Sequence, residues 1–281
     1  LGFEIVSLDE MYERLTTGRS SRRFVCFTLD DGYADNYHHA APVFEAHQVP
    51  FAIYVTTGFL DRTAYFWWML LEEVIRRESS VTLRIEDAEV HRRMASVEEK
   101  TKVFNEFHGI TRGLQAKGCL ATAKRFADDH AIDPEKLCAD HSMTWAMARK
   151  ITERGFGKAE AHTVTHLALS GQEPDDIRAE MEQCCSRIEE QTGYRPRHFA
   201  YPFGDVMAAS SREFEILRSL PILTATTTTE GMLLPTHAGD LSALPRLTLN
   251  GYYQSTGYID VLLSGIGAFF ARSIKRLRAE H

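Results

Sequence analysis

The chain has 281 residues, of which 44% are hydrophobic and 25% charged, a composition typical of a globular protein with one large core or two smaller ones. The formal net charge of −7 argues against nucleic acid as a partner, because no basic excess is present to neutralise phosphates. No apolar run reaches the roughly 20 residues that a membrane-spanning helix needs, so we expect no transmembrane segment.

Cysteine usage and the start of the chain bear on its compartment. The five cysteines form no CxxC pair, and Cys184 and Cys185 are adjacent, which is a poor geometry for a disulfide. No signal peptide is visible, although the sequence begins at Leu1 and upstream residues could be missing. These features predict reduced thiols and a cytoplasmic location.

The first elements read as a β-strand, a helix and a second strand. Residues 24–29 are an apolar run that ends in Asp30 and Asp31, and Gly32 marks a turn. A helix is predicted from about 35 to 45, and residues 51–55 form a second continuous apolar run. Two buried strands around a helix are typical of a parallel sheet.

Residues 61–141 interrupt this pattern. They hold charged, helix-forming segments at 84–118 and 120–130, with one possible strand at 81–85. We interpret them as a mostly helical insertion within a single catalytic domain that spans 1–281. The Trp67-Trp68 pair at its start is expected to anchor the insertion to the core, with stacking on a sugar as the alternative.

The alternation of helices and strands then resumes. The predicted helices are 143–154, 174–193, 210–219 and 259–279, the last with a basic end, and the predicted strands are 157–162, 198–202, 222–227 and 244–249. The whole pattern predicts a barrel-like α/β domain. In such folds the chemistry gathers where the strands end, which is where Asp30, Asp31, His162 and Tyr201 fall.

His162 and His166 are four residues apart and, in a helical turn, would share one face. With one Asp they make the three protein ligands of a catalytic zinc site, although the same set also suits non-haem iron. The second Asp could then act as general base on a metal-bound water. Alternatively, Asp30 and Asp31 are a helix cap and a turn residue.

Three segments carry a family resemblance: T-L-D-D-G at 28–32, H-T-V-T-H at 162–166 and F-A-Y-P-F-G at 199–204. Together, and in this order, they resemble the motifs of the polysaccharide deacetylase family, also called NodB-homology or carbohydrate esterase family 4. The resemblance covers about 22–60 and 140–250. It implies a distorted (β/α) barrel that removes N-acetyl, and sometimes O-acetyl, groups from amino-sugar polymers.

The resemblance also implies roles for individual residues. Asp30 would be the general base, and Asp31, His162 and His166 would hold a divalent metal, most often Zn²⁺. The backbone N–H of Tyr201 would help to bind the oxyanion, since a fixed donor aimed at developing charge strengthens in the transition state.

Two departures from the family pattern concern the catalytic machinery. Many members have an arginine at the place of Ala200 that orients the base. Arg246 could supply that guanidinium, or it could be a surface or fold-stabilising arginine. The family also uses a late histidine as general acid. His237 is the nearest candidate, with a solvated loop residue as the alternative.

The leading hypothesis is therefore a metal-dependent hydrolase acting on the acetamido group of an N-acetylated glycan or glycan precursor. A second hypothesis keeps the fold and changes the substrate to a non-peptide C–N bond of a small molecule. A third is a carbohydrate-binding relative without turnover, which the missing arginine and the uncertain acid would favour. The sequence leaves the oligomeric state open.

Overall fold

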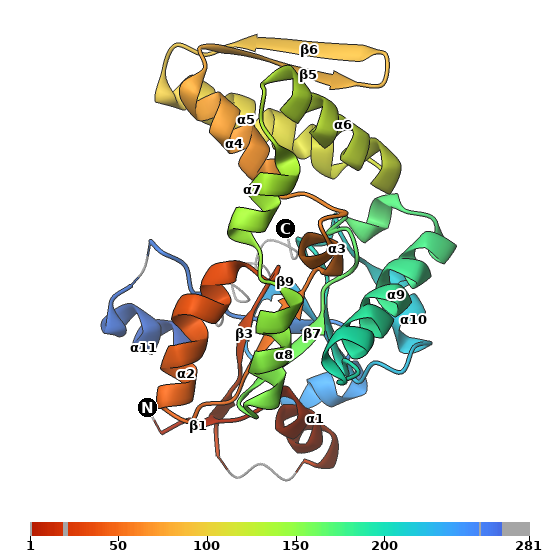
Figure 1. Cartoon of the computed structure of the whole chain (residues 1–281). Coiled ribbons are helices and arrows are strands. Elements are labelled where there is room, and N and C mark those ends of the chain that lie inside the picture. Colours follow the sequence, from red (N-terminus) through yellow and green to blue (C-terminus); the bar gives the residue numbers. More distant parts are fainter. Residues whose placement is uncertain (1, 19–21, 253, 266–281) are drawn as a thin grey trace, which may run out of the picture.

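Six parallel strands form the central sheet of the computed structural model, which describes residues 2–18, 22–252 and 254–265 (Figure 1). Their order across the sheet is β10-β9-β8-β7-β4-β3. The bounds are β3 (Phe27–Leu29), β4 (Phe51–Val55), β7 (Gly157–Ala161), β8 (His198–Ala200), β9 (Thr224–Glu230) and β10 (Leu244–Arg246). Every residue of β4 is buried, as its unbroken apolar sequence predicts.

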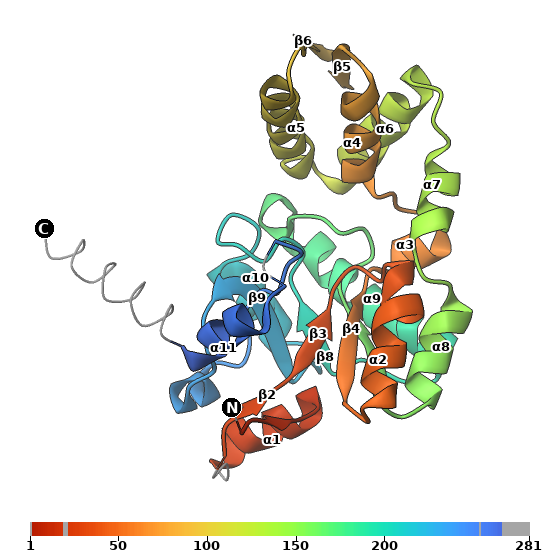
Figure 2. The ribbon, with the colours of Figure 1, turned by 90° about the vertical axis from the view of Figure 1, so that its left-hand side faces the viewer.

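The sheet is curved into a half-barrel, and helices surround it (Figures 1 and 2). This arrangement confirms the predicted distorted (β/α) barrel. The surrounding helices are α2 (Ala41–Ala46), α8 (Trp145–Glu153), α9 (Pro174–Thr192) and α10 (Ser211–Arg218). The residues of α9 at helical spacing are all buried in the core: Ile177, Met181, Cys184, Cys185 and Ile188. Helix α1 (Leu8–Thr17) lies at the amino ends of the strands, where Asp9 contacts His198 at the start of β8.

Two short elements differ from the prediction near the N-terminus. Strands β1 (Glu4–Ile5) and β2 (Phe24–Val25) form a separate parallel pair. The predicted helix at 35–45 begins as a π-helical turn, η1 (Asn36–Ala40), before α2. Asn36 is buried, and its side-chain amide donates a hydrogen bond to the carbonyl of Asp30. The strand that carries the two aspartates is therefore tied to the following helix.

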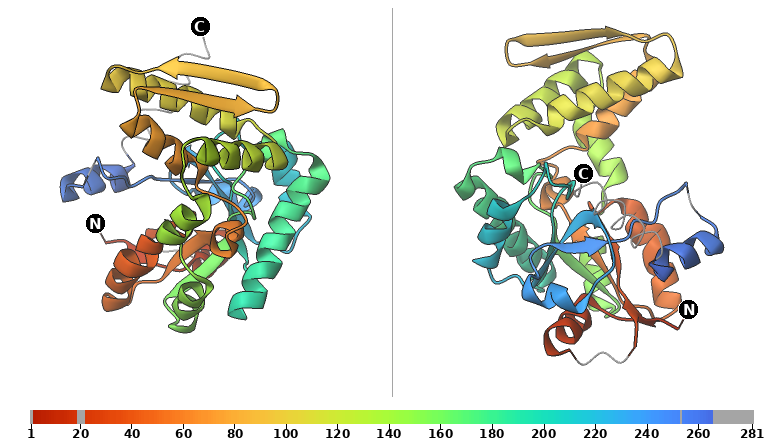
Figure 3. Two further views of the ribbon diagram at one scale, coloured as in Figure 1. Left: turned by 45° about the horizontal axis from the view of Figure 1, so that its top comes forward. Right: turned by 180° about the vertical axis from the view of Figure 1, so that it is seen from behind.

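The inserted elements lie beyond the carboxyl ends of the strands (Figures 1 and 3). They are α3 (Thr57–Asp61), α4 (Trp67–Arg77), β5 (Ser80–Ile85), β6 (Ala88–Arg93), α5 (Val97–Arg112), α6 (Ala116–Asp129) and α7 (Pro134–His141). A second hydrophobic cluster fills the space between α4, β5, α5 and α6.

The possible strand at 81–85 is confirmed as β5, but residues 88–93, predicted within a helix-forming segment, are strand β6, which pairs with β5 as an antiparallel hairpin. The turn places Glu86 at φ 50°. Only Val90 of β6 is partly buried, and its other residues are exposed. Without an alternating apolar face, β6 gave no strand signal, and its charged residues resembled those of a surface helix.

Some short helical elements also lie outside the main sheet. A short 3₁₀ turn, η3 (Pro235–Gly239), connects β9 to β10, and another, η2 (Leu169–Gly171), precedes α9. Helix α11 (Thr256–Ser264) is the described part of the predicted helix at 259–279, whose basic end lies outside the described residues. Within the described ranges, no helix is both long and apolar enough to cross a membrane.

Candidate metal and catalytic site

Asp31, His162 and His166 meet at the carboxyl end of the sheet. Asp31 follows β3 and His162 follows β7. The Oδ1 atom of Asp31 lies 3.2 Å from Nε2 of His162 and 3.1 Å from Nε2 of His166. One ligand atom from each residue lies within 4.8 Å of the other two. The three residues are therefore close enough to share one ion.

The chemistry of these atoms fits a divalent cation. His162 uses its Nδ1 in a 2.7 Å hydrogen bond to the carbonyl oxygen of Ala200. Because a carbonyl only accepts, Nδ1 carries the hydrogen, and Nε2 of the neutral ring presents a lone pair. That lone pair faces a carboxylate oxygen in a buried position. Two acceptors at this distance need positive charge between or on them, either a metal ion or a proton.

The short distances between these side chains also shift the pKa values of Asp31 and His162. Burial opposes ionisation of Asp31, but the adjacent His166 and His162 outweigh it and hold the Asp31 pKa well below its ordinary value. Burial alone would lower the pKa of His162, but Asp31 and Asp30 raise it above its ordinary value. The site thus holds a carboxylate that stays ionised, which suits a metal ligand.

The segment between the two histidines is a turn and not a helix. Thr163 and His166 have φ values of 65° and 56°, in the left-handed region. Glu180 of α9 supports the turn, because its carboxylate accepts hydrogen bonds from the N–H groups of Val164 and Thr165, at 2.8 and 2.9 Å, and from the Thr165 hydroxyl. Burial raises the pKa of Glu180 despite these donors. Sequence reasoning missed this residue, since a glutamate in an amphipathic helix resembles any surface residue.

Asp30 lies beside this cluster and is paired with Arg246. The two guanidinium nitrogens Nη1 and Nη2 each donate to one carboxylate oxygen at 2.8 Å. Nε of Arg246 donates to the carbonyl of Thr227, so the guanidinium is fixed on both sides. Arg246 is mostly buried, with a side chain 17% exposed. The structure thus brings a guanidinium to Asp30 from β10.

Two other predicted residues are placed differently from their expected roles. The N–H of Tyr201 donates to the carbonyl of Thr226 in the sheet, and its buried hydroxyl donates to the carbonyl of Ser242. His237 lies in η3, which packs against α1 at the amino ends of the strands. The structure therefore does not bring His237 to the carboxylate–histidine cluster, and the Tyr201 N–H already has an acceptor.

Aromatic side chains line the other side of His166. Trp68 of α4 lies 4.8 Å from His166 between ring centroids, and Phe203, in the turn after β8, lies 4.9 Å from it. The Trp68 Nε1 donates to the hydroxyl of Tyr33 at 2.8 Å. Trp67 is buried in the second hydrophobic cluster, within the insertion itself, whereas Trp68 packs against both this cluster and the main core and so supplies the expected anchor. Phe203 lies in the F-A-Y-P-F-G segment but was given no role from the sequence, because its contacts with the insertion come from residues 91 to 136 positions earlier.

The fold and this site together define a parallel α/β half-barrel with an Asp-His-His cluster and a second aspartate at the carboxyl ends of its strands. The chain belongs to the polysaccharide deacetylase family, whose model matches residues 17–222. The matched region stops before Arg246. No curated protein is similar enough in sequence to count as a match.

Solved structures with this fold include three bacterial proteins. The deacetylase PplD of Streptococcus pyogenes, in complex with acetate, has a TM-score of 0.56 at 17% identity, covering 88% of this chain and 74% of that chain. IcaB from Ammonifex degensii has a TM-score of 0.57 at 16% identity over 93% and 82%. The BpsB deacetylase domain from Bordetella bronchiseptica has a TM-score of 0.53 at 16% identity over 88% and 79%. At these identities the similarity establishes the fold.

Proposed function

We propose that this protein is a metal-dependent deacetylase that hydrolyses the N-acetyl group of an amino-sugar glycan or glycan precursor. Membership of the polysaccharide deacetylase family supports the reaction class. The observation that carries the proposal is the placement of Asp30, a carboxylate that is not part of the three-residue cluster but lies beside it and is held by Arg246. A carboxylate that is not itself a metal ligand but lies next to the metal site is the arrangement that a hydrolytic general base requires.

Asp31, His162 and His166 would hold the divalent ion, which we take to be Zn²⁺ because two imidazoles and one carboxylate are common ligands of catalytic zinc. When bound, the ion would make its water more acidic and polarise the acetamido carbonyl. Asp30 would take the proton from the attacking water. Because His237 lies at the other end of the sheet, the proton held by Asp30 is also the one available to the leaving nitrogen.

The oxyanion would be stabilised by a backbone donor in the turn after β8. The family resemblance implies the N–H of Tyr201 for this role, but in the structure that N–H donates to the carbonyl of Thr226. The N–H of Phe203 has no acceptor among the described residues, and the Phe203 ring lies against His166. We therefore propose the Phe203 N–H as the donor, where a fixed dipole would favour the developing negative charge.

The test is acetate release from N-acetylglucosamine oligosaccharides by protein stripped with a chelator and then reloaded with Zn²⁺. We expect activity only after reloading, and a loss of roughly 10²- to 10⁴-fold in Asp30→Asn, the range that general bases contribute. O-acetylated glycans and N-acetylated polyamines in the same panel define the substrate. If the stripped protein, or Asp30→Asn, releases acetate as fast as the Zn²⁺-loaded unsubstituted protein, the mechanism is contradicted. Acetate release from N-acetylated polyamines alone would show that the substrate is a small amide.

A further inference from the structure

The two histidines of the cluster are oriented in different ways. His162 is fixed by the hydrogen bond from its Nδ1 to the carbonyl of Ala200. The Nδ1 of His166 is buried and has no hydrogen-bond partner among the described residues. Metal-binding histidines are usually oriented by a hydrogen bond at the nitrogen that does not face the metal. His166 lacks this protein contact, so the packing around its ring must set its orientation.

Two aromatic rings lie nearer to His166 than those of His162 and Phe59, whose centroids are 5.1 and 5.9 Å away. Trp68 and Phe203 lie 4.8 and 4.9 Å from the His166 ring centroid, and Phe203 meets the ring nearly edge-on at 69°. Such tilted and edge-to-face arrangements are the favoured geometries of aromatic pairs. Trp68 belongs to α4, at the start of the inserted segment 61–141. One of the two rings on His166 therefore comes from the insertion directly.

The other ring, that of Phe203, is held by the insertion indirectly. Phe203 has φ 61°, a conformation that is unusual for a bulky residue and persists only where surrounding contacts fix it. The guanidinium carbon of Arg112, at the end of α5, lies 4.5 Å from the centre of the Phe203 ring. Trp67 and His108 of the insertion complete the ring's surroundings, with centroid distances of 6.4 and 5.9 Å.

Arg112 also binds the turn that carries Phe203. Its Nη2 donates to Oδ1 of Asp205 at 2.6 Å, and the same oxygen accepts from the N–H of Met207. Burial opposes ionisation of Asp205, but the hydrogen bond and charge of Arg112 outweigh it and lower the pKa of Asp205. One guanidinium thus spans both the ring of Phe203 and the carboxylate two residues later, which a flexible ammonium group could not do with the same geometry.

We propose that the inserted segment is part of the metal site and that Arg112 is a positioning residue for His166, acting through the ring of Phe203. The inference rests on the proposed function only in its assumption that Asp31, His162 and His166 bind a divalent ion. Its consequence is that substitution of Arg112, which contacts none of the three ligand residues in the described structure, weakens metal binding.

The experiment is a titration of the stripped protein with Co²⁺, without substrate, followed by visible absorption, which reports ligand geometry. We expect Arg112→Ala to weaken Co²⁺ binding by about tenfold, the lower end of the range for residues that support metal ligands, and to change the spectrum. Arg112→Lys, which can keep the ion pair with Asp205 but not the flat contact with the ring, should fall between Arg112→Ala and the unsubstituted protein.

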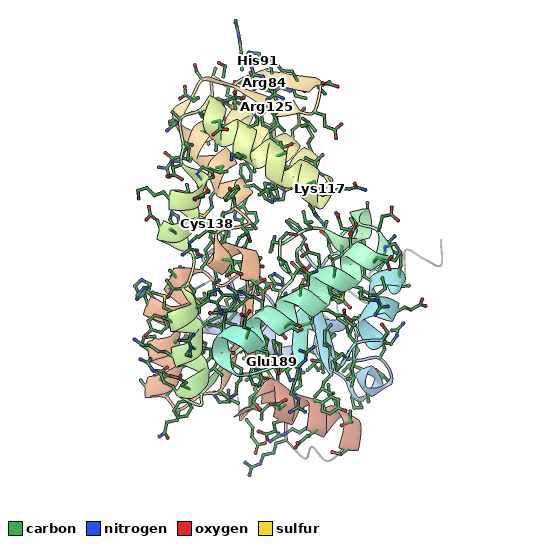
Figure 4. The ribbon with its side chains drawn as sticks, turned by 45° about the vertical axis from the view of Figure 1, so that its right-hand side comes forward. Arg84, His91, Lys117, Arg125, Cys138 and Glu189 are labelled. Carbon is green, nitrogen blue, oxygen red and sulfur yellow. The ribbon has the colours of Figure 1, made fainter. Side chains whose placement is uncertain are left out.

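The matched control is Arg84→Ala. Arg84 is another arginine of the insertion, paired with Asp129 at 2.5 Å, and it lies at the outer end of that segment, far from the sheet (Figure 4). Co²⁺ binding by Arg84→Ala should equal that of the unsubstituted protein. A double variant, Arg112→Ala with Phe203→Leu, should bind no more weakly than Phe203→Leu alone, because Arg112 acts through that ring.

The outcomes separate this inference from the proposed function. If the unsubstituted protein binds Co²⁺ and Arg112→Ala binds it equally well with the same spectrum, the positioning role is overturned and the proposed function stands. Additive losses in the double variant would also overturn it. Absence of Co²⁺ binding by the unsubstituted protein would overturn both. If thermal unfolding shows that Arg112→Ala is not folded, the same comparison of Co²⁺ affinity and spectrum is made with Arg112→Lys.

Discussion

Arg246 and Asp30 form a two-pronged ion pair between the edge strands of the sheet, with both N–O distances at 2.8 Å. Asp30 follows β3 and Arg246 ends β10, and these strands lie at opposite ends of the six-stranded order. The pair therefore depends on the curvature that turns the sheet into a half-barrel. Burial of Arg246 opposes its charge, but Asp30 outweighs burial and raises the pKa of Arg246 further above its ordinary value.

We expect Arg246→Lys to reduce turnover by roughly 10- to 100-fold, a part of what a general base contributes, because an ammonium group cannot hold both oxygens of Asp30 in place. Metal content should not change, since Arg246 does not contact the three ligand residues through any described hydrogen bond or ion pair. Acetate release measures turnover, and elemental analysis of the same preparation measures metal content. Arg218→Lys is the control, because Arg218 pairs with Asp240 on the surface. Equal activity in Arg246→Lys and Arg218→Lys would show that the pair only stabilises the fold.

Substitutions of the two adjacent aspartates should have different effects on metal binding. Asp31→Asn should lose the ion, because Asp31 is the residue that faces both histidines. Asp30→Asn should keep it and lose only turnover. A saturating ion stabilises a protein that binds it, by about 2.7 kcal/mol at 100 times the dissociation constant. Thermal unfolding with and without Zn²⁺ measures this, and a Zn²⁺-induced rise in Tm for Asp31→Asn but not for Asp30→Asn would reverse our assignment.

Glu180 should matter for the metal although it is not a ligand. Its carboxylate accepts three hydrogen bonds from the turn between His162 and His166. An amide at this position replaces one acceptor by a donor, so Glu180→Gln should weaken Zn²⁺ binding by about 10- to 100-fold. Glu189→Gln is a matched control on the same helix, because Glu189 is exposed and pairs with Arg195 (Figure 4). Zn²⁺ affinity that is equal in the two variants would mean that the turn keeps its shape without Glu180.

The pair of Asp61 and Arg187 predicts a pH dependence of stability. Asp61 ends α3 and accepts hydrogen bonds from Arg187, at 2.7 and 2.9 Å, and from Nε1 of Trp145. Burial opposes ionisation, but the bonds from Arg187 and Trp145 outweigh it, so the pKa of Asp61 is lowered in the folded protein. The stabilisation is therefore present above the unfolded pKa of about 3.9 and is lost as the pH falls through the lower folded value.

The measurement for Asp61 is the free energy of unfolding from denaturant titrations of the unsubstituted protein and Asp61→Asn between about pH 2 and 7. The advantage of the unsubstituted protein should be constant above about pH 5 and shrink below about pH 4. Asp87→Asn, in the exposed turn of the hairpin, is the control and should show no such trend. An advantage that grows as the pH falls would contradict the sign of the predicted effect.

Local sequence was sufficient for much of the fold. Buried strands such as β4 have an unbroken apolar sequence, and α9 shows its buried face at helical spacing. Both signals come from neighbouring residues and need no knowledge of the partners. The hairpin strand β6 gave no such signal, because it is held by pairing with β5 and exposes most of its side chains.

The sequence by itself determined the strands of the main sheet, the long helices and the candidate set of Asp30, Asp31, His162 and His166, because each lies in or close after a locally recognisable element. Only the tertiary structure decided their surroundings. It joined Arg246 to Asp30, moved His237 to the far end of the sheet and placed Arg112 on Phe203. These relationships depend on how a curved sheet and an inserted segment pack, and residues that meet by packing across 90 or 200 positions leave no periodic pattern in the chain.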